Sequence, residues 1–142
     1  MNYDGVGIII ENQRGDFLLH LRDGNTSIMT NQWCLVGGAT EPGENILDSA
    51  LREVKEETGL TLIQSEYIKS FPRADKLVAL VKGTVDTDRE HMVLGEGADL
   101  KFFSRSGVVA LINSLDYSNP YLEEFSVYLA DALANEAMDR GA

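Results

Sequence analysis

The sequence predicts an α/β fold in which helices cover the faces of a mixed β-sheet. Two observations predict it. Along the chain, strand-like apolar runs come first, then one helical segment, then further strand-like runs and finally helices. The length of 142 residues suits one domain with one substantial core, and a hydrophobic content of 44% is that of a folded globule. We therefore expect a single domain over residues 1–142.

The N-terminal part predicts a β-hairpin followed by a third short strand. Val6–Ile10 and Phe17–Leu21 are apolar runs separated by a polar, turn-rich stretch, as in two antiparallel strands. A further apolar run covers Trp33–Val36, and the glycine pair Gly37–Gly38 then breaks the chain.

The segment from Ile46 to about Thr58 predicts a helix. Asn45 is a suitable N-cap, and Gly59 stands where such a helix would end. Apolar residues recur at spacings of three and four, which places them on one stripe: Leu47, Ala50, Leu51 and Val54.

The C-terminal part predicts three more strands and two helices. The strands are expected at Leu62–Phe71, Lys76–Val85 and Leu100–Phe103, and an acidic, glycine-bearing loop precedes the last of them. One helix is expected over Ser106–Leu115. A second starts at Asn119–Pro120 and ends near Gly141, with one apolar face made of Leu122, Phe125, Leu129 and Leu133.

Composition excludes several classes of protein. With 12 Lys+Arg against 23 Asp+Glu the net charge is −11, which argues against a general nucleic-acid binder. No apolar run is long enough to span a bilayer, and the N-terminus has no basic, then apolar, export signal. Cys34 is the single cysteine, so neither an intrachain disulfide nor a multi-cysteine metal site is expected. These features favour a cytoplasmic protein. A phosphorylated ligand would need another source of positive charge, and a divalent metal is the obvious one.

The predicted central helix carries a cluster of carboxylates. Glu53, Glu56 and Glu57 project from one side of it, next to the apolar stripe. Three carboxylates within a turn repel one another unless a cation collects them, and oxygen ligands at this density suit Mg²⁺ or Mn²⁺. Arg52 lies one turn before Glu56 and is expected to orient it by an ion pair. Taken alone, such a helix is more often a solvated surface.

The surrounding residues change that balance. Nine positions between residues 38 and 60 match the pattern G-x5-E-x7-R-E-(apolar)-x-E-E-x-G-(apolar) completely: Gly38, Glu44, Arg52, Glu53, Val54, Glu56, Glu57, Gly59 and Leu60. In this respect the sequence resembles the Nudix hydrolase family. The resemblance implies a Nudix-type α/β/α sandwich with a mixed sheet between helices. Many members carry a proline before the paired glycines, where this chain has Val36; that difference concerns loop geometry rather than metal binding.

The resemblance also implies roles for these residues. Glu53, Glu56 and Glu57 match the glutamates that bind the divalent cations holding a diphosphate. Glu44 matches a residue that supports the loop and sometimes joins the metal ligands. Arg52 matches the arginine that orients a helix glutamate.

A water activated by the metal would attack one phosphorus in line, and a carboxylate would accept its proton. Glu53 is one candidate for this base. Glu96, in a glycine-flanked loop before the last strand, is the other, although it is equally explained as a surface acid. The sequence leaves the choice open.

Substrate residues lie outside the motif. Gly37 and Gly38 would let the backbone approach a phosphate. Arg22 would meet a terminal phosphate, unless it simply faces solvent. Trp33 would stack on a base, although an aromatic at a strand start is more often core. Asn119 matches the asparagine with which MutT-like members read a purine edge, and a plain helix cap explains it as well.

His20 and His91 lack a partner cluster and are not expected to be ligands. Nothing precedes the first strand that resembles the extra N-terminal segment of many ADP-ribose and sugar-nucleotide enzymes. The resemblance therefore favours a Mg²⁺-dependent nucleoside triphosphate pyrophosphohydrolase of MutT type, acting as monomer or homodimer on a small nucleotide. The alternative is a nucleotide-sugar, ADP-ribose or dinucleoside polyphosphate pyrophosphatase. A domain that binds nucleotides without hydrolysis is disfavoured, because every motif glutamate is present.

Overall fold

A computed structural model of the chain describes residues 2–22, 31–95, 97 and 99–141, with the side chains of 137–141 left aside. Within these residues seven strands form one sheet: β1 (Gly5–Glu11), β2 (Phe17–Leu21), β3 (Trp33–Cys34), β4 (Val36–Ala39), β5 (Gln64–Arg73), β6 (Lys76–Thr84) and β7 (Asp99–Phe103). The helices are α1 (Ile46–Thr58), α2 (Arg105–Ser114) and α3 (Pro120–Gly141). No helix in this part of the chain is long and apolar enough to cross a bilayer.

The sheet is mixed, as predicted. Its main path runs β3-β2-β1-β6-β5, and only the β1–β6 pair is parallel among the described strands. β4 pairs with β1 from Gly5↔Ala39 to Ile8↔Val36, whereas β2 pairs with β1 only at Ile10↔Leu18 and Glu11↔Phe17. β3 thus pairs with β2, whereas β4 pairs with β1. The single strand predicted over Trp33–Val36 is therefore divided at Leu35.

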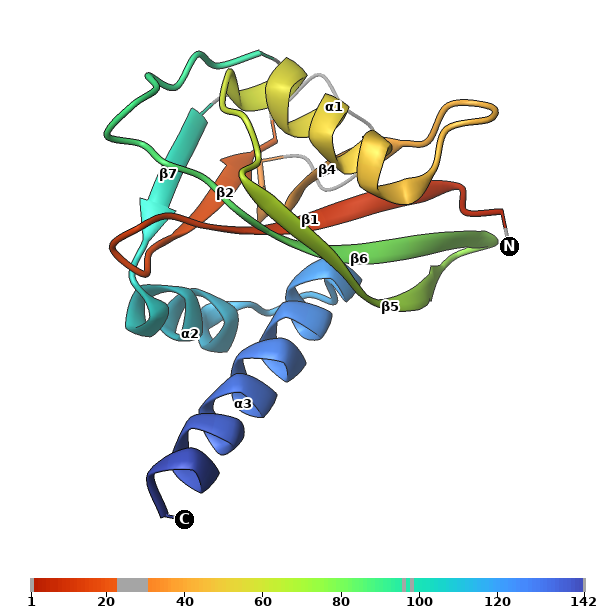
Figure 1. Cartoon of the computed structure of the whole chain (residues 1–142). Coiled ribbons are helices and arrows are strands. Elements are labelled where there is room, and N and C mark those ends of the chain that lie inside the picture. The colour runs from red at the N-terminus through yellow and green to blue at the C-terminus, as the bar shows by residue number, and fades with distance from the viewer. Residues whose placement is uncertain (1, 23–30, 96, 98, 142) are drawn as a thin grey trace.

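Helices cover both faces of the sheet. Figure 1 shows α1 on one face and α2 with α3 on the other, which confirms the α/β/α sandwich. The alternation of side chains along β1 and β2 fills both layers. Ile8 and Leu18 belong to the core under α1, and Ile9 and Leu19 belong to the core under α2 and α3. All four side chains are fully buried.

The predicted boundaries of α1 are confirmed. The Asn45 side chain accepts a hydrogen bond from the Asp48 amide at 2.9 Å, which caps the N-terminus. Gly59 ends the helix in the left-handed region at φ 75°, and its N–H donates to the Lys55 carbonyl at 3.0 Å. A non-glycine residue would be strained at this φ.

The predicted apolar stripe of α1 is wrong in part. Leu47 and Leu51 are 38% and 43% exposed. The face of α1 that is buried carries smaller and polar residues: Ser49, Ala50, Glu53, Val54 and Thr58. The helix is thus rotated relative to the expectation, and Glu53 lies against the sheet rather than at the margin of the core.

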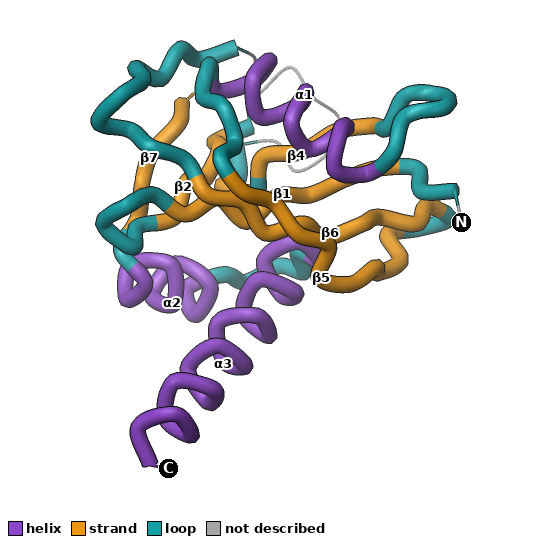
Figure 2. Tube along the Cα trace, in the orientation of Figure 1, coloured by secondary structure: helices purple, strands orange, loops and turns teal. Residues whose placement is uncertain are grey.

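Two smaller differences concern the C-terminal helices. α2 begins at Arg105, one residue before the expected start, because the Ser104 hydroxyl accepts from the Gly107 amide at 3.0 Å and caps it. In α3, Leu122, Phe125 and Leu129 are buried as predicted, but Leu133 is 58% exposed. Figure 2 shows that the C-terminal half of α3 extends beyond the sheet.

Candidate functional site

Arg52 is the centre of an ion-pair network between the β4–α1 loop and α1. Its Nε and Nη2 bind both oxygens of Glu44, at 2.9 and 3.0 Å, and Nη2 also donates to the Ala39 carbonyl at 3.1 Å. Its Nη1 donates to Glu53 at 2.9 Å and to Glu56 at 3.2 Å. These contacts occupy all five guanidinium N–H groups. The expected ion pair between Arg52 and Glu56 is present, and Arg52 also binds Glu44 and Glu53.

Glu44 supports the loop that precedes α1. Its carboxylate accepts from the Arg52 guanidinium, from the Ser49 hydroxyl and, at 3.1 Å, from the Glu41 amide. These hydrogen bonds, those from Arg52 first, lower the pKa of Glu44 to about 2. The carboxylate is therefore ionised at every physiological pH.

Glu53 is buried beneath β4. Its residue is only 7% exposed, and a Cβ at Gly38 would lie 2.6 Å from its Oε1 and 2.7 Å from its Oε2. A larger residue at position 38 would therefore displace the helix carboxylate from this position. Burial raises the pKa of Glu53, and the Arg52 ion pair opposes the rise. Gly37 has a different reason to be glycine, because a Cβ there would lie 2.1 Å from the Val6 carbonyl oxygen.

Glu56 and Glu57 both lie on α1 but differ in how far their side chains are exposed. The Glu56 side chain is 57% exposed, whereas that of Glu57 is 15% exposed and lies 3.7 Å from the Nδ1 of buried His20. Among the described residues, no three His, Cys, Asp or Glu side chains already form a metal cage. The donors that α1 offers are nonetheless all carboxylates, and this donor set fits Mg²⁺ or Mn²⁺ rather than zinc.

The loop that leads to β7 is attached to the C-terminal end of α1. Val93 donates to the Thr58 carbonyl at 2.8 Å, and Gly95 donates to the Glu57 carbonyl at 3.0 Å. Gly97, at φ 99°, lies against His20, since a Cβ there would meet the His20 Nε2 at 1.9 Å. Glu96, the other candidate base, lies outside the described residues. Of its two neighbours, Gly95 contacts the backbone of α1 and Gly97 contacts His20.

The sequence did not predict that His20 would be buried beside the carboxylate cluster. It is 4% exposed and lies between Glu57 and Gly97. The period-two alternation of β2 puts His20 on the same face as Leu18, which packs in the core under α1. The pattern alone could not say which face of the sheet α1 would cover, so it gave His20 no partner.

A cavity of about 230 Å³ lies on the other side of the glycine pair from Glu53. Gly37 and Gly38 line it, as does Arg22 at the end of β2. Arg73 and Lys76 also line it. No local sequence pattern distinguishes these two cations, because their position beside the cavity follows from the pairing of β5 with β6.

The remaining predicted substrate residues lie outside this cavity's wall. Trp33 packs edge-on against Phe103, with ring centroids 5.1 Å apart, and its role in stacking stays a prediction. Asn119 is 1% exposed, and its Oδ1 caps α3 by accepting from the Leu122 amide at 3.2 Å. It lies behind Cys34, whose Sγ is 4.0 Å from that oxygen and which does line the cavity. Burial raises the pKa of the Cys34 thiol to about 11.

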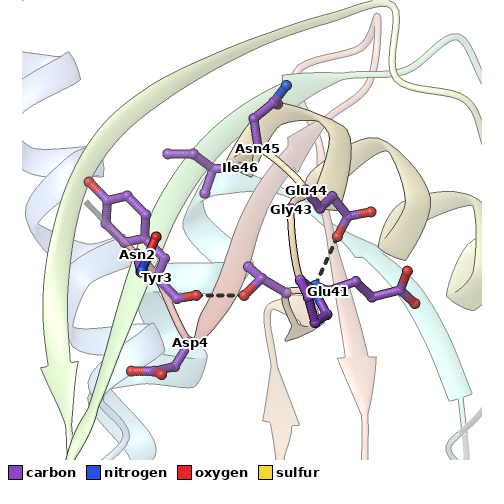
Figure 3. Close-up of a pocket in the computed structure, with 10 residues that line it drawn as sticks. Asn2, Tyr3, Asp4, Glu41, Gly43, Glu44, Asn45 and Ile46 are labelled. Atoms are coloured by element: carbon purple, nitrogen blue, oxygen red, sulfur yellow. Dashed lines mark hydrogen bonds between the residues drawn. The ribbon is translucent and has the colours of Figure 1, made fainter.

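A larger hollow, of about 540 Å³, lies between the N-terminus and the β4–α1 loop. Figure 3 shows that the carboxylates of Glu41 and Glu44 point away from Tyr3, and therefore away from this hollow. Thr40 closes the loop onto the N-terminal segment by donating to the Tyr3 carbonyl at 2.5 Å. The acidic groups of the loop thus face Arg52.

Comparison with known proteins is consistent with this geometry. A family model described as NUDIX domain matches residues 1–125. The m7GpppN-mRNA hydrolase NUDT17 of Bos taurus is 40% identical over 63 residues, which is 44% of this chain and 21% of that protein. The nucleoside triphosphatase NudI of Salmonella schwarzengrund (strain CVM19633) is 43% identical over 58 residues, 41% of this chain and 40% of that protein.

Solved structures have the same fold. The MutT protein from Methanosarcina mazei Go1 is 24% identical, with a TM-score of 0.68 over 89% of this chain and 94% of that one. A C. elegans Ap4A hydrolase is 23% identical, with a TM-score of 0.64 over 89% and 98%. The chain spans about a fifth of NUDT17 and two fifths of NudI, so neither relative's activity transfers directly.

Proposed function

The chain belongs to the Nudix hydrolase family, whose members act on phosphoric anhydrides, and from this premise we propose that it hydrolyses a nucleoside triphosphate with Mg²⁺, or alternatively Mn²⁺, as cofactor. The products would be a nucleoside monophosphate and pyrophosphate, as for MutT-type enzymes. The observation that carries the proposal is the Arg52 network, which holds Glu44 of the preceding loop together with Glu53 and Glu56 of α1.

The residues proposed to hold the metal are Glu53, Glu56 and Glu57, with Glu44 as an accessory ligand. When bound, the cation would supply positive charge to the diphosphate oxygens and acidify a water. The contribution of this chain's own residues is to hold the carboxylates close together in spite of their mutual repulsion. Arg52 offsets the mutual repulsion of its neighbours, and the glycine at position 38 makes room for Glu53.

Two carboxylates are proposed as alternatives for the base that accepts the proton of the attacking water. Glu53 has the support of its buried position beside Gly38. Glu96 has the support of its neighbours, because Gly95 contacts the α1 carbonyls and Gly97 contacts His20. The Glu96→Gln variant distinguishes them, because Glu53 is also a proposed metal ligand and Glu53→Gln would lower kcat in either case. Loss of the base lowers kcat by about 10²- to 10⁴-fold, so a nearly unchanged kcat in Glu96→Gln would leave Glu53 as the base.

A small nucleotide is the proposed substrate. The similarity to the nucleoside triphosphatase NudI over 58 residues supports a triphosphate. Asn119 supports a nucleoside partner, because its buried Nδ2 has no hydrogen-bond partner among the described residues. The backbone of Gly37 and Gly38 lines the 230 Å³ cavity beside Glu53, where it can approach a phosphate.

The test is pyrophosphate and phosphate release from a panel of nucleotides with Mg²⁺, with and without EDTA. The panel holds normal and 8-oxo nucleoside triphosphates, nucleotide sugars, ADP-ribose and dinucleoside polyphosphates. We expect fast release of pyrophosphate from a triphosphate that EDTA abolishes and Glu56→Gln strongly reduces. The matched control is Glu136→Gln, since Glu136 pairs with Arg105 at 3.5 Å on α3. Turnover of only the other compounds would overturn the substrate, and undiminished turnover by Glu56→Gln would overturn the metal site.

A further inference from the structure

The 230 Å³ cavity beside the glycine pair has a positive wall in an acidic protein. Arg22, Arg73 and Lys76 line it, and Asp4 is the one acidic residue among its described lining. The whole chain has a net charge of −11. Three of its cations at one cavity therefore make a local positive potential against the general field.

Two of these cations form no ion pair with a carboxylate among the residues that the structure describes. Seven of the other Lys and Arg side chains form ion pairs with carboxylates: Arg14, Arg52, Lys55, Lys69, Lys82, Arg89 and Arg105. Within the described part of the chain, neither Arg73 nor Lys76 has such an ion pair. The carboxylate of Asp4, which also lines the cavity, accepts from the amide of Leu77, the residue after Lys76, at 2.7 Å.

The β5–β6 hairpin holds these two cations side by side. Arg73 and Lys76 are the last register pair before the turn, so their Cα atoms lie opposite each other across a two-residue loop. Ala74 in this loop has φ 53°, an uncommon value for a residue with a side chain. The Arg73 guanidinium lies 5.9 Å from the ring centroid of Tyr121, a cation–π contact that fixes its direction.

A single strand, β4, separates the cavity from the carboxylate cluster. Gly38 lines it on one side and, on the other, is the residue against which Glu53 packs. The two regions meet at the end of β4, where Ala39 lines the cavity and its carbonyl accepts from Arg52 of the carboxylate network. A substrate whose diphosphate lies at the glutamates can reach the cavity with its neighbouring group around this strand end. A positive wall stabilises that group only if it is an anion, whereas a neutral sugar gains nothing from it.

Resting on the proposed function, we propose that Arg73 and Lys76, together with Arg22, bind a phosphate of the substrate beyond the diphosphate held at the glutamates. This pair selects nucleotides with three or more phosphates over those in which the diphosphate joins a neutral group.

The kinetic test compares a nucleoside triphosphate with ADP-ribose in the full-length chain. Arg73→Gln and Lys76→Gln, singly and together, remove charge while keeping polar side chains. We expect each single variant to raise KM for the triphosphate about tenfold, and the ratio of kcat/KM for the triphosphate to that for ADP-ribose to fall by a similar factor. The control, Arg89→Gln, removes an equal charge from an exposed ion pair with Asp86. An unchanged ratio, or an equal loss on both substrates, overturns the proposal.

A binding measurement separates this proposal from the proposed function. Inorganic tripolyphosphate, titrated calorimetrically in EDTA, probes the cations without catalysis. We expect binding that weakens with salt and falls at least about tenfold in the double variant. If the wild-type chain hydrolyses no triphosphate yet shows this loss, the proposed function fails and the anion site stands. If tripolyphosphate binds both proteins equally, the anion site fails whatever the activity.

Discussion

The carboxylate of Glu53 lies directly beneath the Cα of Gly38, so close that a Cβ would be 2.6 Å from its Oε1. The contact joins the strand that carries the backbone of the substrate cavity to the helix that carries the acidic cluster. This contact explains on steric grounds, without any substrate, why the motif has glycine at position 38. The cavity and the carboxylates consequently lie on opposite sides of β4.

Substituting Gly38 by alanine should displace Glu53. We expect a loss of about 1–3 kcal/mol in the free energy of unfolding, typical of overpacking, together with a larger than proportional fall in kcat. Urea denaturation and steady-state kinetics measure the two effects. Gly107→Ala is the control, because a Cβ at that helical position comes within 3.2 Å of one atom, the Ser104 Oγ, and no nearer than 3.8 Å to the next. Equal activity of Gly38→Ala and wild type would contradict the contact.

Replacing Arg52 by lysine should damage the site although the charge is kept. Lysine has three donors on one atom, whereas Arg52 uses five N–H groups on Glu44, Glu53, Glu56 and the Ala39 carbonyl. We expect a fall in kcat of at least about tenfold and a higher Mg²⁺ concentration at half-maximal activity. Arg105→Lys, in a single exposed ion pair with Glu136, should leave both unchanged. A fully active Arg52→Lys would show that only the charge matters.

The acid stability of the metal-free protein should depend on Glu44. Its pKa in the folded chain is about 2, below its ordinary value of 4.5. A lowered pKa contributes stability that is complete above pH 4.5 and is lost as the pH falls through 4.5 toward about 2. Glu44→Gln should therefore be less stable than wild type at neutral pH, and the difference should shrink across that window. Denaturant unfolding at a series of pH values measures it, and a difference independent of pH would refute the assignment.

The sequence was sufficient for the fold and for the acidic half of the site. Helix caps, glycines and apolar periods are local signals, so the bounds of α1 and the closeness of Arg52 to Glu56 could be predicted from spacing. The rotation of α1 could not be, because Leu47 and Leu51 fit the same periodicity as the truly buried residues. Only contact with the sheet selects the face that packs.

The basic half of the site depends on pairings between distant segments. Arg73 and Lys76 line the cavity with Arg22 because β6 runs parallel to β1, which brings the β5–β6 turn to the start of β1. No residue near Arg73 and Lys76 in the sequence indicates that their turn lies at the start of β1. The same is true of His20, whose neighbour Gly97 comes from the other end of the chain's acidic loop.

His20 should therefore matter although the sequence suggested no role for it. In His20→Ala, Gly97 loses the ring on which it packs, and Glu57 loses a neighbour 3.7 Å away. We expect a stability loss of about 2 kcal/mol, in the range for truncating a buried side chain, and a reduced kcat. His91 is exposed, which makes His91→Ala the matched control. Identical behaviour of the two variants would show that the His20 contacts have no functional weight.

Cys34 should be chemically silent in the folded protein. Its thiol is buried, its residue is 2% exposed, and burial raises its pKa to about 11, so almost no thiolate forms at neutral pH. We expect iodoacetamide at pH 8 to modify it only as fast as the chain unfolds, and urea to restore the rate of a free cysteine. Because Cys34 lines the cationic cavity, tripolyphosphate should slow the residual labelling of the wild type but not of the Arg73→Gln, Lys76→Gln double variant. Rapid native labelling, detected by mass spectrometry, would show that the cavity opens around Cys34 without unfolding.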